Sequence, residues 1–125
     1  MVKLSKLMRW LPFGKVPEID PQALHASMSG SNPPGILDVR TSSEWERSRI
    51  VGAVNVPITE LASRLGELPF DRNEPLVTIC LSAHRSIPAV RLLREAGYKD
   101  VRQLRGGMLN WWKAKLPADK QRRRA

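Results

Sequence analysis

The chain has 125 residues, 42% of them hydrophobic, one cysteine and a formal net charge of +9. This length predicts one domain that buries its own core, and a single cysteine excludes an internal disulfide. With only two histidines beside that cysteine, no structural zinc site is expected, and no cofactor is predicted. No apolar run approaches the roughly 20 residues that span a bilayer, and Lys6 and Arg9 interrupt the first apolar stretch. We therefore expect no secretory signal and a cytoplasmic location, where a thiol stays reduced.

The positive charge is concentrated at the two ends of the chain. Residues 1–16 hold four basic and no acidic side chains, residues 113–125 hold six basic and one acidic, and the rest is balanced. We expect a basic extension at 1–16, a globular domain at 17–116 and a basic tail at 117–125. Basic ends attract anionic lipids and other polyanions, but they are also commonly solvated. We expect weak membrane or polyanion contact at most, and no specific nucleic-acid partner.

The extension carries an apolar stripe with helical spacing, formed by Leu4, Leu7, Met8 and Leu11, and Pro12 ends it. A basic amphipathic helix of this kind suits a membrane surface or a partner protein. It could equally pack on its own domain. Alone it is too short to be stable.

From residue 17 onward, predicted helices and strands alternate. Asp20 and Pro21 predict the start of a helix that Gly30 ends. Strands are expected at 35–39, 53–56, 76–79 and 101–104. Further helices are expected at 43–47, 57–68, 86–96 and 108–113. This alternation predicts an α/β fold with a mainly parallel central sheet and helices on both faces. The most apolar strand, 76–79, should be central.

Cys80 follows that strand directly, and ligands of such sheets bind beyond the carboxyl ends of the strands. The segment from Cys80 to Ser86, here called the Cys80 loop, leads into a predicted helix. Backbone N–H groups at a helix start attract anions and favour a thiolate, and Arg85 adds a permanent cation. The residues thus indicate a reactive thiol that handles anions. The alternative is that Cys80 is a small buried apolar residue.

Three segments, in order along the chain, resemble the single-domain rhodaneses, a family of sulfurtransferases. The first combines Leu37-Asp38-Val39-Arg40, Glu44-Trp45 and Ile50-Val51-Gly52-Ala53-Val54-Asn55-Val56-Pro57. The second is Cys80-Leu81-Ser82-Ala83-His84-Arg85-Ser86, similar to a C-x-x-G-x-R-S loop. The third holds Gly97-Tyr98, Val101, Leu104, Gly106-Gly107 and Trp111. Together they cover nearly all of residues 17–116, and the resemblance implies a rhodanese-like α/β fold.

The resemblance implies sulfur transfer from thiosulfate or a persulfide to a thiol, a protein acceptor or cyanide. Cys80 would carry the sulfur as a persulfide, and Arg85 would orient the small anionic donor. The remaining loop residues would bind substrate: Leu81, Ser82, Ala83, His84 and Ser86. A protonated His84 would favour the thiolate, unless it is simply an exposed loop residue.

Other residues of the resembling segments are expected to be structural. Asp38 and Arg40 should support the site through an ion pair or turn hydrogen bonds. Trp45 and Trp111 should be core aromatics, whereas Trp112 either flanks the site or covers the surface.

Two departures from the family pattern stand out. Ser48-Arg49 replaces a Gly-His pair, and Ala83 replaces a loop glycine. If position 83 requires a positive φ, alanine there costs about 1 kcal/mol. That strain puts catalytic efficiency in doubt rather than the fold.

Two other functions compete with sulfur transfer. Cysteine phosphatases and arsenate reductases also place a cysteine and an arginine at the ends of an anion loop. Phosphatases of the rhodanese fold have a longer loop than the four residues between Cys80 and Arg85, and the sequence shows no acid in or beside the loop to protonate a leaving group. The other competitor is a rhodanese-like binding or regulatory module with weak catalysis.

Overall fold

The central sheet consists of five parallel strands in the order β1–β6–β5–β2–β4. This computed structural model describes Leu11 and residues 14–120. The strands of the sheet are β1 (Glu18–Ile19), β2 (Gly35–Asp38), β4 (Val54–Asn55), β5 (Leu76–Ile79) and β6 (Val101–Leu104). The strand predicted to be central, β5, lies in the middle with all four residues buried. The predicted α/β fold with a mainly parallel sheet is confirmed.

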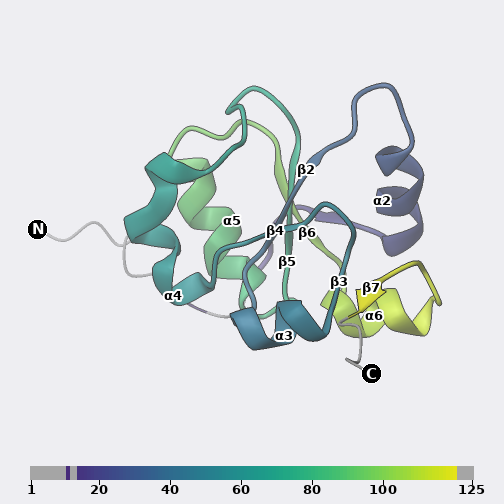
Figure 1. The fold of residues 1–125 in the computed structure, drawn as a ribbon. Coiled ribbons are helices and arrows are strands. Elements are labelled where there is room, and N and C mark those ends of the chain that lie inside the picture. The colour runs from purple at the N-terminus through teal and green to yellow at the C-terminus, as the bar shows by residue number, and fades with distance from the viewer. Residues whose placement is uncertain (1–10, 12–13, 121–125) are drawn as a thin grey trace, which may run out of the picture.

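Helices cover both faces of this sheet, as predicted. Figure 1 shows α4 and α5 on one side and α2 and α6 on the other, with α3 near the carboxyl end of β2. The helices are α2 (Pro21–Met28), α3 (Ser42–Arg47), α4 (Ile58–Leu61), the 3-10 helix η1 (Ala62–Glu67), α5 (Ser86–Glu95) and α6 (Gly107–Lys113). Among the described residues, no helix is long and apolar enough to cross a membrane.

Alternating side chains of the strands build two cores, one on each face. In β5, Leu76 packs into the core beneath α4 and α5, whereas Val77 packs into the core beneath α2 and α6. Trp111 is fully buried in the second core, as predicted, and its indole N–H donates to the Pro117 carbonyl at 3.0 Å. Trp45 is only half-buried, so the prediction that it is a core aromatic holds in part.

Three short strands were not predicted. One is β1, and the other two, β3 (Ser48–Arg49) and β7 (Asp119–Lys120), pair antiparallel in a small second sheet. The first residues of the expected basic tail thus pair with the domain. The helix predicted from Pro57 is split into α4 and η1. The expected N-terminal helix and residues 121–125 lie outside the described part, except Leu11, whose carbonyl accepts a hydrogen bond from Arg91 at 2.9 Å.

Candidate active site

Cys80 lies immediately after the central strand, at the carboxyl edge of the sheet. Its side chain is a free thiol, and the residue is only 1% exposed, packed with the core beneath α5. The Cys80 loop then turns outward, with Ser82 and His84 exposed, and enters α5 at the buried Ser86. The structure therefore combines the two interpretations of Cys80: the residue is buried, yet it begins the loop at the edge where ligands of parallel sheets bind.

The start of the Cys80 loop is held by α6. The backbone N–H of Met108 donates to the carbonyl of Cys80 at 2.8 Å, and that of Leu109 donates to the carbonyl of Leu81 at 3.0 Å. Gly107 makes this close approach possible, because a Cβ there would collide with the carbonyl oxygens of Cys80 and Leu81. The third segment of the family resemblance thus supports the second one directly.

The middle of the loop contains the strained residue that the sequence suggested. Ala83 has a φ of 78°, in the region that favours glycine. On either side of it, the Ser82 hydroxyl lies 2.9 Å from Nδ1 of His84. The Ser86 hydroxyl is buried and has no hydrogen-bond partner among the described groups. The seven residues of the Cys80 loop lie together because they are consecutive in the chain, whereas the groups that position them come from other elements.

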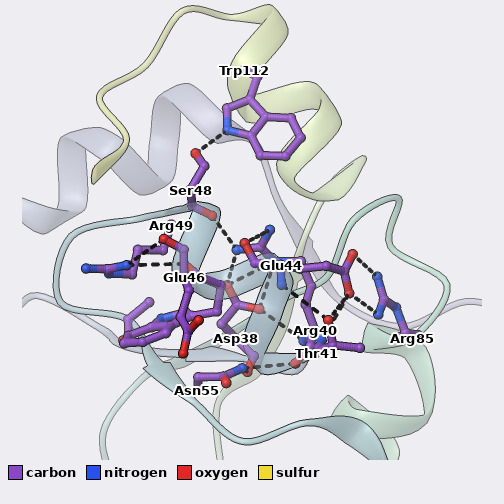
Figure 2. Close-up of polar contacts among 12 residues, drawn as sticks. Asp38, Arg40, Thr41, Glu44, Glu46, Ser48, Arg49, Asn55, Arg85 and Trp112 are labelled. Atoms are coloured by element: carbon purple, nitrogen blue, oxygen red, sulfur yellow. Dashed lines mark hydrogen bonds and ion pairs between the residues drawn. The ribbon is translucent and has the colours of Figure 1, made fainter. Parts of the chain in front are cut away.

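Glu44 reaches the loop from α3 and holds Arg85, a contact that the sequence did not reveal. Nη1 of Arg85 donates to Oε1 of Glu44 at 2.6 Å, and Nη2 donates to Oε2 at 2.9 Å (Figure 2). The expectation that no acid lies beside the loop is therefore wrong. Glu44 is 41 positions away from Arg85 in the chain, but the fold brings the two side chains into contact.

The ion pair shifts both pKa values. Hydrogen bonds from Arg85 lower the pKa of Glu44 to about 2, helped by hydrogen bonds from Thr41 and opposed by partial burial. The pKa of Arg85 is raised, chiefly by its hydrogen bonds to Glu44 and less by the charges of Glu44, Cys80 and Asp38. Glu44 is consequently ionised at neutral pH.

Asp38 and Arg40 form a buried ion pair beneath this contact, one of the two arrangements predicted. Nη2 of Arg40 lies 2.6 Å from Oδ2 of Asp38, and the two side chains are 1% and 0% exposed. Arg40 also donates to the carbonyls of Glu44 at 3.3 Å and Ser48 at 2.7 Å. The amide of Asn55 donates to the carbonyls of Asp38 and Arg40. These bonds set the turn between β2 and α3.

The turn continues into a capping box that aims Glu44 at the loop. The Thr41 hydroxyl accepts from the N–H of Glu44 at 3.2 Å, and the Glu44 carboxylate accepts from the N–H of Thr41 at 3.0 Å. The threonine three residues before a glutamate was a signal for this cap. It was not a signal for the partner, because Arg85 is distant in the chain.

The residues that depart from the family pattern have structural partners. Ser48 gives its carbonyl to Arg40, and its hydroxyl accepts from the indole N–H of Trp112 at 3.0 Å (Figure 2). Arg49 lies over the ring of Trp45 at 4.3 Å and pairs with Asp119 at 3.3 Å. Trp112 is 37% exposed and covers this surface. Among the described residues, no group of three or more His, Cys, Asp or Glu side chains could hold a metal ion.

Comparison with known proteins gives consistent relatives. A sulfurtransferase from Allochromatium vinosum is 33% identical over 102 residues, covering 82% of this chain and 94% of that protein. An HTH-type transcriptional regulator from Mycobacterium tuberculosis is 44% identical over 86 residues, covering 67% of this chain but only 37% of the regulator. A solution NMR structure of a rhodanese-like domain from Anabaena sp. superimposes with a TM-score of 0.75 at 28% identity, covering 85% of this chain and 80% of that one.

The sequence profile of the rhodanese-like domain matches residues 20–114. This range includes four of the five strands of the central sheet, all but β1, together with the helices from α2 to α6. It also includes Cys80, Arg85 and the supporting pair Asp38 and Arg40. The chain therefore belongs to the rhodanese-like domain family, a family of sulfurtransferases.

Proposed function

We propose that this protein transfers sulfane sulfur from a small anionic donor, thiosulfate or a persulfide, to a thiol, a protein acceptor or cyanide. The observation that carries the proposal is the placement of Cys80. The thiol ends the central strand, its own carbonyl is anchored by α6, and the loop after it ends in an arginine at the start of α5. Among the relatives is a sulfurtransferase that this chain matches over 94% of its length.

The proposed reaction has two steps, the first of which loads Cys80 with sulfur and the second of which regenerates the Cys80 thiolate. The Cys80 thiolate attacks the outer sulfur of thiosulfate, a new S–S bond forms, and sulfite leaves with the electrons of the broken S–S bond. A persulfide donor loses its thiolate in the same way. An acceptor thiolate, or cyanide, then attacks the outer sulfur of the Cys80 persulfide and releases the Cys80 thiolate.

The loop supplies the electrostatic support in this proposal. The N-cap residue Arg85 makes no side-chain hydrogen bond to the first turn of α5, and in this proposal the N–H groups of that turn and of residues 81–86 stabilise the persulfide anion. Arg85 closes the far end of the loop. Asp38 and Arg40 act indirectly, by setting the turn that positions Glu44 against Arg85.

A catalytically weak binding or regulatory module is the second candidate. It is favoured by the strained Ala83 and by the match to one part of a transcriptional regulator. A phosphatase or arsenate reductase is disfavoured, because Glu44, the acid beside the loop, has a pKa of about 2 and cannot donate a proton at neutral pH. A cytoplasmic location, and weak contact of the basic ends with membranes or polyanions, remain predictions.

Intact-protein mass spectrometry tests the proposal. The reduced protein, incubated with thiosulfate or with a persulfide, should gain the mass of one sulfur atom, and cyanide should remove it. The variant Cys80→Ser should gain nothing. If the folded, reduced wild type gains no sulfur from either donor, the protein is a binding module rather than a sulfurtransferase.

A further inference from the structure

Arg85, the cation of the Cys80 loop, is not a free positive charge. Both of its terminal nitrogens are used in the bidentate contact with Glu44, at 2.6 and 2.9 Å. The two side chains are similarly accessible, with 32% of Arg85 and 28% of Glu44 exposed. A bidentate pair fixes the plane of the guanidinium and compensates its charge. An incoming anion therefore meets a neutral pair.

Glu44 is itself held in place by three groups. Oε1 accepts from the N–H of Thr41 at 3.0 Å and from its hydroxyl at 3.1 Å. The Glu44 carbonyl accepts from Arg40, which is buried against Asp38. The low pKa of Glu44 keeps the carboxylate ionised at neutral pH. The charge compensation is thus a fixed property of the fold and not a chance contact of two mobile side chains.

The compensated pair acts close to the nucleophile. Arg85 lies five residues after Cys80 in the same loop, and the charge of Cys80 contributes to the raised pKa of Arg85. A donor must approach a negative thiolate here. A dianion is repelled more strongly than a donor with at most one negative charge, and Arg85 offsets little of that repulsion while it is paired.

We infer that Glu44 determines donor specificity: by compensating Arg85 it disfavours dianionic thiosulfate and favours a persulfide that carries at most one negative charge. This inference rests on the function proposed above. In the favoured step the Cys80 thiolate attacks the outer sulfur of R–S–SH, and the R–S⁻ thiolate leaves with the electrons of the old S–S bond. Thiosulfate would instead release the sulfite dianion.

The variant Glu44→Gln tests the inference with little change in shape. Glutamine also serves as the fourth residue of a capping box, so the start of α3 should remain intact. The two donors are thiosulfate and the persulfide of N-acetylcysteamine, which carries no charge apart from its sulfur. We expect kcat/KM for thiosulfate to rise about tenfold, mainly through a lower KM, since one uncompensated cation faces a dianion. For the persulfide we expect a change below about threefold.

Two further variants isolate the charge effect. Glu46→Gln changes the net charge equally at an exposed position of the same helix, and both donors should stay within about twofold of the wild type. The double variant Glu44→Gln/Arg85→Gln has a neutral pair again, so the ratio of the two kcat/KM values should return to within about threefold of the wild type. In Glu44→Gln alone, added salt should weaken the thiosulfate reaction more steeply.

The outcomes separate this inference from the proposed function. If both donors load Cys80 and the donor ratio is the same in the wild type and in Glu44→Gln, the inference is wrong and sulfur transfer stands. An equal loss for both donors would also overturn it, because Glu44 would then only position the loop. If Glu44→Gln does not fold, the salt dependence of the wild type decides, because a thiosulfate reaction that added salt weakens steeply, beside an unaffected persulfide reaction, would show an uncompensated Arg85 and overturn the inference. No sulfur transfer in the wild type would overturn both.

Discussion

The carbonyl oxygen of Cys80 accepts a hydrogen bond of 2.8 Å from the backbone N–H of Met108. This bond joins the candidate nucleophile to α6, a helix that begins 27 residues later at Gly107. Gly107 lies against the same carbonyl oxygen, where a side chain would not fit. The position of the thiol thus depends on a glycine that takes no part in the chemistry.

Gly107→Ala should therefore destabilise the protein and displace the Cys80 loop. The new Cβ would collide with the backbone oxygens of Cys80 and Leu81, which cannot move aside cheaply. We expect the free energy of unfolding to fall by at least about 2 kcal/mol. Gly52→Ala is the matched control, because Gly52 also has a positive φ, 86°, but nothing within 4 Å. It should cost about 1 kcal/mol, and equal losses in urea denaturation would refute the proposed collision.

Asp38→Asn should be among the most damaging conservative changes in the chain. It leaves the guanidinium of Arg40, which is 1% exposed, without its charge partner. Breaking a buried pair in this way costs about 3–5 kcal/mol. The exposed pair of Arg49 and Asp119 provides the comparison, and Asp119→Asn should cost less than about 1 kcal/mol in the same denaturation experiment. Comparable losses would mean that the buried pair contributes no more than a surface one.

Ala83→Gly should not destabilise the protein, although glycine usually does. Alanine at a φ of 78° is strained by about 1–2 kcal/mol, and removing that strain offsets the extra freedom of glycine in the unfolded chain. Ala89→Gly, in the middle of α5, should cost about 1 kcal/mol or more. The two variants are compared by their denaturation midpoints. A loss of similar size at both positions would show that the positive φ of Ala83 carries no strain.

Stability should fall in acid partly through Glu44. Its pKa is about 2 in the folded protein against an ordinary value of 4.5, so the unfolded chain binds the proton first as the pH falls. The stabilising contribution is fully present above pH 4.5 and is lost as the pH falls towards 2. Between these values the unfolding free energy should decline less in Glu44→Gln than in the wild type or in Glu46→Gln. Identical declines in all three would contradict a low pKa for Glu44.

Cys80 should react selectively with small reagents in the folded state. The residue is 1% exposed, so a bulky aromatic disulfide should label it far more slowly than iodoacetamide, relative to their rates on the unfolded chain. Mass spectrometry of timed samples measures both rates, with Cys80→Ser as the blank. If the bulky reagent is slowed no more than the small one, the thiol is open to large acceptors without movement of the loop.

The sequence predicted the layered fold well because its signals are local. The strand at 76–79 is continuously apolar, and the Asp20-Pro21 pair predicts the start of α2, so both were placed correctly. The two-residue strands β1, β3 and β7 are too short to show a period of two, and no such signal existed for them. The helix from Pro57 becomes a 3-10 helix after Leu61, a change of winding that apolar spacing does not specify.

By itself the sequence determined the α/β fold, the resemblance to the rhodaneses, and Cys80 and Arg85 as the candidate pair at the ends of one loop. These follow from side-chain alternation and from residues that lie within a few positions of each other. Only the tertiary structure decided that the thiol is buried, that α6 holds its carbonyl, and that Glu44 compensates Arg85. The physical reason is that such contacts arise from sheet order and helix packing, which bring together groups that are tens of residues apart in the chain.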